Sequence, residues 1–193
     1  MELQVVEYEL AQDESTPLDA AARIVYRIDE YEAEYGTGPV TLRGPARVLS
    51  FELVVQASPE AKLSAPVADP DPAHPQLIRL DTVSFPPGGV AYLHVHRGPG
   101  IRVLLQGEIR IDTEGHSQSY QPLEAWFETG PAPVFAAASA SLPTAFVRCM
   151  VLPAELLGKR SLRYVRDEDA DKPKLQEYRI FVDEPLSDAP VVT

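Results

Sequence analysis

Apolar and polar side chains alternate along most of this chain, in short runs interrupted by glycine, proline and acidic clusters. A period of two places every second side chain on one face of a β-strand. In the first part of the chain this pattern predicts strands over Leu3–Leu10, Arg23–Ile28 and Ala46–Val55. Residues 57–75 contain five prolines and little apolar periodicity, which is typical of a loop.

The densest strand signal follows this Pro-rich loop. Six short runs lie there at roughly 8–12 residue spacing, namely LIRLDTVSF, VAYLHVH, IRVLLQGEIRI, EAWFE, PVFAAAS and TAFVRCMVLP. Many short strands at even spacing indicate an antiparallel sandwich or barrel. Beyond them we expect a short helix near Pro153–Lys159 and one more strand at Glu177–Asp183.

These patterns predict an all-β protein with one principal barrel. The expected parts are N-terminal strands packing on the barrel (residues 1–56), a Pro-rich loop (57–75), the barrel itself (76–153) and a C-terminal extension with one strand (154–193). A chain of 193 residues is long enough to bury a core without disulfides. Its only cysteine, Cys149, excludes an intrachain disulfide.

The net charge of the chain limits the classes of partner that we expect. The net charge of −12 repels polyphosphates, so we expect neither nucleic acid nor an anionic membrane surface as a partner, although the same charge also serves solubility. No apolar run approaches the roughly 18 residues of a membrane span, and the N-terminal residues lack the pattern of a signal peptide. A cytoplasmic location is the resulting expectation.

The strongest chemical signal is the pair His94 and His96. Because these histidines are two residues apart on a predicted strand, both imidazoles lie on the same face of it. Neutral imidazole is a good ligand for first-row transition metals. Together with Gly88 and Gly107, the two histidines occupy four of the five fixed positions of a known family motif. That motif consists of a glycine, two histidines separated by one residue, a glutamate and a second glycine. The segment therefore resembles the first motif of the cupin superfamily, except that Gly100, or Ile101 in the longer spacing, stands in the glutamate position.

The second cupin motif is weaker in this chain. The segment LEAWFETGPAPVFAAAS occupies its place, but its histidine position falls on Pro133 or Val134 and no asparagine follows. The resemblance implies a double-stranded β-helix (a jelly-roll barrel) with a pocket at one mouth and, commonly, a homodimer. It also implies that His94 and His96 are metal ligands, here for Fe, Zn, Ni or Mn. Because two ligands make a weak site, the absence of any metal is an equally open prediction.

Three further residues are candidates for the pocket. Glu128 follows Trp126 on the same strand face and would serve as a third metal ligand or an acid/base group, unless the register differs and it is solvated. Arg102 would face inward and hold Glu128 or an anionic substrate, or else pair with Glu108 or Asp112 at the rim. Tyr92 shares the parity of the histidines and would add a phenol, unless it is a core residue.

Several other positions add little to this interpretation. Gly100 would leave space for substrate or water next to the histidines. Exposed positions are expected for His74 and His116, and a buried, unreactive thiol for Cys149.

The leading functional hypothesis is a metal-dependent enzyme acting on a small, anionic organic molecule, as a dioxygenase, isomerase, decarboxylase or lyase. The catalytic candidates are Glu128, Arg102 and Tyr92, and the metal candidates are His94, His96 and Glu128. The alternative is a non-catalytic cupin that binds or senses a small molecule with a decayed metal site. A third interpretation treats the two histidines as rim residues of an unrelated β-sandwich.

Overall fold

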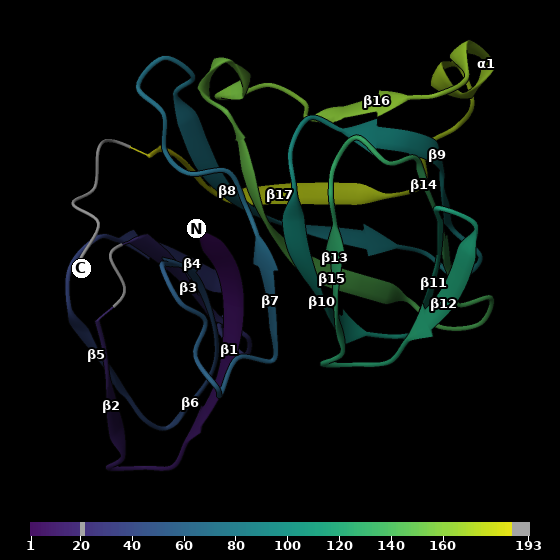
Figure 1. Ribbon diagram of the computed structural model, residues 1–193. Coiled ribbons are helices and arrows are strands. Elements are labelled where there is room, and N and C mark those ends of the chain that lie inside the picture. The colour runs from purple at the N-terminus through teal and green to yellow at the C-terminus, as the bar shows by residue number, and fades with distance from the viewer. Residues whose placement is uncertain (20–21, 187–193) are drawn as a thin grey trace.

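The computed structural model describes residues 1–19 and 22–186, and antiparallel strands dominate it (Figure 1). In chain order the strands are β1 (Glu2–Leu10), β2 (Ser15–Leu18), β3 (Ala22–Arg27), β4 (Glu32–Gly36), β5 (Val40–Arg43), β6 (Ala46–Val54), β7 (Leu63–Pro66), β8 (Gln76–Phe85), β9 (Val90–His96), β10 (Gly100–Gln106), β11 (Ile109–Thr113), β12 (His116–Tyr120), β13 (Ala125–Glu128), β14 (Val134–Ala138), β15 (Thr144–Pro153), β16 (Leu162–Tyr164) and β17 (Glu177–Pro185). Two short helical turns, η1 (Ala154–Leu156) and α1 (Asp167–Ala170), accompany them. None of the described helices has the length and apolar character needed to cross a membrane.

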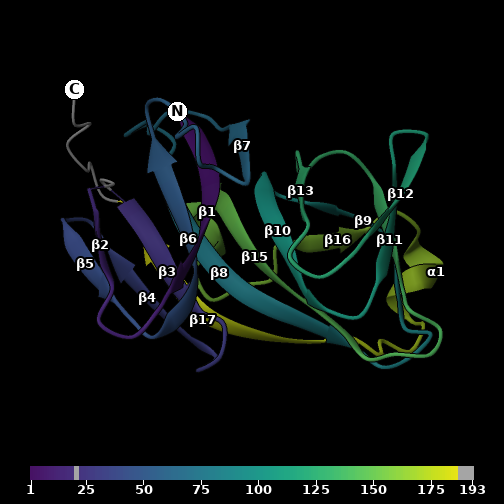
Figure 2. The ribbon, with the colours of Figure 1, turned by 90° about the horizontal axis from the view of Figure 1, so that it is seen from below.

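Three five-stranded sheets stack as layers (Figure 2). We call them the N-terminal sheet (β4-β3-β6-β1-β7), the middle sheet (β13-β10-β15-β8-β17) and the outer sheet (β12-β11-β14-β9-β16). Strands β2 and β5 form a separate two-stranded sheet beside the first layer. The middle sheet is therefore covered on both faces, which explains why its three central strands, β10, β15 and β8, are buried almost throughout.

Strand alternation divides the middle sheet between two cores. Ile78 and Leu80 of β8 pack with residues of the N-terminal sheet such as Phe51. Val83 and Phe85 of the same strand face the outer sheet and join a second apolar cluster. The cavity described below lies within this second core, between the middle and outer sheets.

The chain passes back and forth between these two sheets. Strands β8, β10, β13, β15 and β17 belong to the middle sheet, and the strands between them belong to the outer sheet. This alternation defines a jelly-roll barrel. The prediction of an all-β jelly-roll fold is thus confirmed.

Strand boundaries match the sequence pattern best where the pattern is apolar. Strands β1, β3, β6 and β17 occupy the expected positions within a few residues. The expected loop at residues 57–75, however, contains β7, which pairs with the edge of β1 through its backbone. Strand β7 has four residues, one of them a proline, and is too short for its alternation to be detected in the sequence.

Candidate functional site

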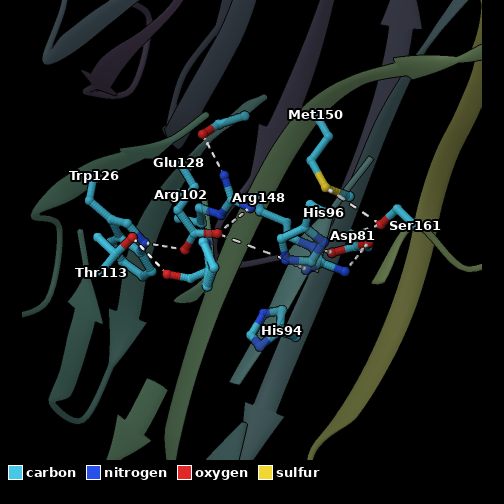
Figure 3. A network of polar contacts seen from close by, with 12 residues as sticks. Asp81, His94, His96, Arg102, Thr113, Trp126, Glu128, Arg148, Met150 and Ser161 are labelled. Atoms are coloured by element: carbon cyan, nitrogen blue, oxygen red, sulfur yellow. Dashed lines mark hydrogen bonds and ion pairs between the residues drawn. The ribbon is translucent and has the colours of Figure 1, made fainter. Parts of the chain in front are cut away.

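Four strands of the middle sheet place one row of side chains across its inner face. Arg102 on β10 lies opposite Trp126 on β13 and opposite Arg148 on β15. Arg148 lies in turn opposite Asp81 on β8. Because residues in register share a face, these side chains are neighbours inside the barrel (Figure 3).

This row forms part of a cavity of about 130 Å³ between the two sheets. One part of its wall is apolar and is formed by Val83, Phe85, Ala91, Ile111, Val134, Ala136 and Phe146. The polar part is formed by Asp81, His94, His96, Arg102, Glu128 and Arg148. Exposed residues of the wall, among them Lys159, Arg160, Tyr178 and Ile180, mark the mouth near the edge strands β16 and β17.

Two buried ion pairs organise the polar wall. Arg148 donates to both carboxylate oxygens of Asp81, with Nε–Oδ1 at 2.6 Å and Nη2–Oδ2 at 3.1 Å. Arg102 Nη2 lies 2.8 Å from Glu128 Oε2, and its Nη1 donates to the carbonyl of Gly100 at 2.5 Å. The Trp126 indole donates to Glu128 Oε1 at 2.9 Å. Both guanidinium groups are therefore held in fixed orientations.

The two arginines differ in accessibility. The Arg148 side chain is 12% exposed, whereas that of Arg102 is 1% exposed. Burial lowers the pKa of Arg102 to about 10, against the opposing effect of Glu128. Arg148 is therefore the guanidinium that a molecule in the cavity reaches, and Arg102 lies behind it in a closed pair with Glu128.

Hydrogen bonds assign the tautomers of both histidines. His94 Nδ1 lies 2.7 Å from the carbonyl of Tyr92, and since a carbonyl only accepts, Nδ1 carries the proton and Nε2 the lone pair. His96 Nε2 lies 3.4 Å from Arg148 Nη1, a donor, so Nε2 accepts and Nδ1 faces Ser161 Oγ at 3.4 Å.

The electrostatic environment keeps both imidazoles uncharged. Burial lowers the pKa of His94, with Glu128 opposing the shift. Burial also lowers the pKa of His96 well below its usual range, and the charges of Arg148 and Arg102 lower it further. Both side chains are thus neutral at pH 7.

The donor set does not fit the transition metal that the cupin resemblance implies. Among the described residues, no group of three or more His, Cys, Asp or Glu side chains is arranged to hold a metal ion. The lone pair of His96 faces the Arg148 guanidinium, and Glu128 is engaged by Arg102 and Trp126. A cation placed between the histidines would meet the fixed positive charge of Arg148, and the nearby carboxylate of Glu128 is already paired with Arg102.

Four of the five candidate site residues line the cavity together, namely His94, His96, Arg102 and Glu128. His96 Nε2 and Glu128 Oε2 are 3.8 Å apart, and the two imidazole rings meet edge to face at 4.9 Å. The expected pairing of Arg102 with Glu128 is present. The metal and catalytic roles assigned to these residues remain predictions.

The structure corrects the placement of Tyr92. His94 pairs with Val134, but Ala91 pairs with Ala136, so β9 contains one more residue than β14 between these two pairs. This β-bulge breaks the alternation, and Tyr92 is not among the residues of the cavity wall. Its ring instead lies 5.0 Å from the ammonium group of Lys172.

Gly100 also differs from expectation. A Cβ atom at this position would lie 2.7 Å from Met150 Cγ and 2.5 Å from the Cys149 carbonyl. Met150 therefore occupies the space that the sequence suggested for substrate or water.

Sequence reasoning missed Arg79, Asp81 and Arg148. All three are charged residues inside otherwise apolar strands, LIRLDTVSF and TAFVRCMVLP, and that interruption is the signal that marks them. Arg79 binds Asp183 at 2.8 Å and the carbonyl of Leu156, so it joins β8 to β17 and η1.

The remaining candidates have the positions that the sequence suggested. His74 is exposed and pairs with Asp71, and His116 is exposed at the start of β12. Cys149 is fully buried, and burial raises the pKa of its thiol. Its low accessibility and raised pKa make it unreactive.

Comparisons with known proteins found similarity among solved structures alone. No protein-family model matches the sequence, and no curated protein matches it. Similar solved structures include the DMSP lyase DddQ of Ruegeria pomeroyi DSS-3, with 21% identity, a TM-score of 0.38, and 45% of this chain matched to 43% of that one. They also include an oxalate oxidase, with 17% identity, a TM-score of 0.36 and coverage of 42% and 47%. A third is a cupin superfamily protein of Desulfitobacterium hafniense DCB-2, with 17% identity, a TM-score of 0.34 and coverage of 38% and 68%.

The chain thus matches less than half of the length of the lyase and the oxidase. The similar structures include proteins described as cupins. The expected jelly-roll barrel is confirmed by the strand order of this chain itself.

Proposed function

We propose that this protein binds a small organic anion in the cavity of its jelly-roll barrel. The observation that carries the proposal is the local charge. Six lining residues are cationic and two are acidic, although the whole chain has a net charge of −12; counting Asp183, which pairs with Arg79 from outside the wall, six cationic groups meet three carboxylates. The cationic residues are Arg79, Arg102, Arg148, Lys159, Arg160 and Lys174, and the acidic ones are Asp81 and Glu128. Such concentration of one sign in a cleft attracts a ligand of the opposite sign.

The shape of the cavity supports a ligand with an apolar body. Phe85, Phe146 and Val83 line one part of the wall, and the charged groups line the other. A cavity of about 130 Å³ suits a molecule of about the size of benzene. A short-chain carboxylate combines these features, with its carboxylate at Arg148 and its hydrocarbon part against the phenylalanines.

Arg148 is ready to receive a carboxylate. Its orientation is fixed by Asp81 on one side and by His96 on another. Of its five N–H groups, these contacts use three, and the remaining two donate to no other described residue. A fixed guanidinium loses little freedom when it binds an anion, which favours affinity.

A second candidate is a metal-independent enzyme that uses acid–base chemistry. His94 supports it, because this neutral imidazole lines the cavity with Nε2 unprotonated. A base in that state accepts a proton from a bound molecule, as isomerase and lyase chemistry requires. Binding is common to both candidates and is therefore tested first.

The test compares butyrate with butyramide by isothermal titration calorimetry. The two probes have similar size, but only butyrate carries a charge. We expect butyrate to bind at least about tenfold more tightly, because a charged acceptor strengthens hydrogen bonds from a guanidinium. Equal affinity for the two probes, or no binding of butyrate at millimolar concentration, would overturn the proposal.

Two variants test whether butyrate binds at Arg148. Arg148→Lys preserves the charge beside Asp81 but removes the planar fork, and we expect it to weaken butyrate binding about tenfold. The matched control is Arg163→Gln, since Arg163 is an exposed residue of β16 outside the cavity wall. This control should bind butyrate like the wild type.

A further inference from the structure

We infer that the anion bound in the cavity is a small hydroxy acid, whose carboxylate is bound by Arg148 and whose hydroxyl donates to His94 Nε2. The inference rests on the proposed function and adds the chemical class of the ligand. It follows from the hydrogen-bonding groups that the polar wall leaves without partners.

The first of these groups is the Nε2 atom of His94. Its Nδ1 proton is donated to the Tyr92 carbonyl at 2.7 Å, so Nε2 can only accept. No described residue donates to it, and in Figure 3 His94 stands apart from the network of dashed contacts. His94 is nevertheless part of the cavity wall and is 5% exposed. A hydrogen-bond donor on the ligand would give this acceptor its partner.

His96 differs from His94 in this respect. Its Nε2 atom already faces Arg148 Nη1 at 3.4 Å, and its Nδ1 atom faces Ser161. Of the two imidazoles, only His94 offers an open acceptor to the cavity. The two histidines therefore differ in role: His96 contacts Arg148, whereas His94 is available to a ligand.

The second open group is the pair of N–H donors that Arg148 retains after binding Asp81 and His96. These donors require an acceptor, and the cationic wall favours an anionic one. The open donors and the open acceptor both belong to neighbours of His96, since Arg148 contacts its Nε2 atom and the ring of His94 lies 4.9 Å from its ring. Both groups line the same small cavity, so one small molecule can contact the two.

The positive charge of the cavity wall favours a neutral hydrogen-bond donor on the ligand over a cationic one. An ammonium group would also satisfy His94 Nε2, but it would enter a site where six cationic residues meet three carboxylates, Asp183 included. A hydroxyl donates without adding positive charge. The combination of an acceptor anion, a neutral donor and an apolar body describes a short-chain hydroxy acid.

The decisive experiment measures binding of 2-hydroxybutyrate, 3-hydroxybutyrate and butyrate to the wild-type protein by calorimetry. We expect one of the hydroxy acids to bind at least about tenfold more tightly than butyrate, because a buried acceptor left unpaired by butyrate weakens its binding. Trp126, the only tryptophan of the chain, donates to Glu128 beside the cavity, and its fluorescence provides an independent signal from this site.

His94→Leu tests the residue assignment. This variant removes the acceptor, so we expect butyrate binding to be retained and the advantage of the hydroxy acid to fall below about threefold. His116→Leu is the matched control, because His116 is exposed and outside the cavity wall. Circular dichroism of both variants checks that they are folded.

The outcomes separate the two proposals. If butyrate binds and neither hydroxy acid binds more tightly, the anion site stands and the hydroxy-acid inference is wrong. If none of the three probes binds, the proposed function and the inference are both wrong. If the hydroxyl advantage persists in folded His94→Leu, the assignment to His94 is wrong.

Discussion

Arg102 and Glu128 form an ion pair from which water is almost completely excluded. The two side chains are 1% and 7% exposed, and their charged atoms lie 2.8 Å apart. A buried pair of this kind contributes little net stability, but removal of one partner leaves an uncompensated charge. Glu128 is thus the counter-ion of Arg102, and its roles as a metal ligand or an acid/base group stay predictions.

This description predicts an asymmetry between single and double variants. Glu128→Gln should lower the free energy of unfolding by about 3 kcal/mol, because the Arg102 charge loses its partner. The double variant Arg102→Met/Glu128→Met should recover most of that loss, since neither charge remains. Urea denaturation followed by circular dichroism measures both. A double variant less stable than the single one would contradict this account.

The buried histidines predict how stability depends on pH. The folded pKa values of His94 and His96 lie below their usual range, so at acidic pH the unfolded chain binds protons that the folded chain does not. Their contribution to stability is therefore complete above about pH 6.5 and is lost as the pH falls toward the folded pKa values. Each histidine contributes a slope of at most about 1.4 kcal/mol per pH unit.

Urea denaturation at pH 7, 6 and 5 tests this slope. His96→Gln should flatten it, because one group that resists protonation has been removed. His116→Gln, at an exposed position, should leave the slope unchanged. A slope that is the same in all three proteins would show that His96 does not cause it.

At the scale of the element, strand β9 shows why the site was only partly predictable. Its alternation identified the shared inward face of His94 and His96, and their burial agrees with it. The same alternation misplaced Tyr92, because the bulge in β9 depends on pairing with β14, a partner distant in sequence. Local periodicity contains no information about such a register change.

The partners of the histidines were unpredictable for a similar reason. Arg148 and Asp81 lie 67 residues apart and meet only because β15 and β8 pair in one register. Their sequence signal, charges inside apolar strands, indicates burial but does not identify partners. The all-β fold was predictable because it depends on local alternation alone, whereas β7 and β16 arise from pairing to existing strand edges.

Strand β10 passes so close to β15 at Gly100 that a Cβ atom there would overlap the Cys149 carbonyl and Met150. Gly100→Ala should therefore lower the free energy of unfolding by about 2 kcal/mol, through overpacking. Gly38→Ala is the control, since a Cβ atom there has no neighbour within 4 Å. Equal stability of the two variants in urea would contradict the close contact.

At the scale of the whole molecule, the middle sheet couples the cavity to the N-terminal sheet. Alternate residues of β8 face opposite ways, so Arg79 and Asp81 line the cavity while Ile78 and Leu80 pack against the N-terminal sheet. The same strands thus position the charged wall and bury the larger apolar core. Without the N-terminal sheet, the back of the cavity wall would expose a continuous apolar face to water.

This coupling predicts that the layers unfold together. Phe51 is fully buried between the N-terminal and middle sheets, so Phe51→Ala should lower the free energy of unfolding by about 4 kcal/mol. Trp126 reports on the barrel, because it belongs to the apolar cluster between the middle and outer sheets and Phe51 does not, while far-UV circular dichroism reports on all sheets. Both signals should show a single transition with the same lowered midpoint in urea. If the Trp126 transition kept its wild-type midpoint while the dichroism signal shifted, the N-terminal sheet would be an independent unit, and the cavity would not depend on it for its shape.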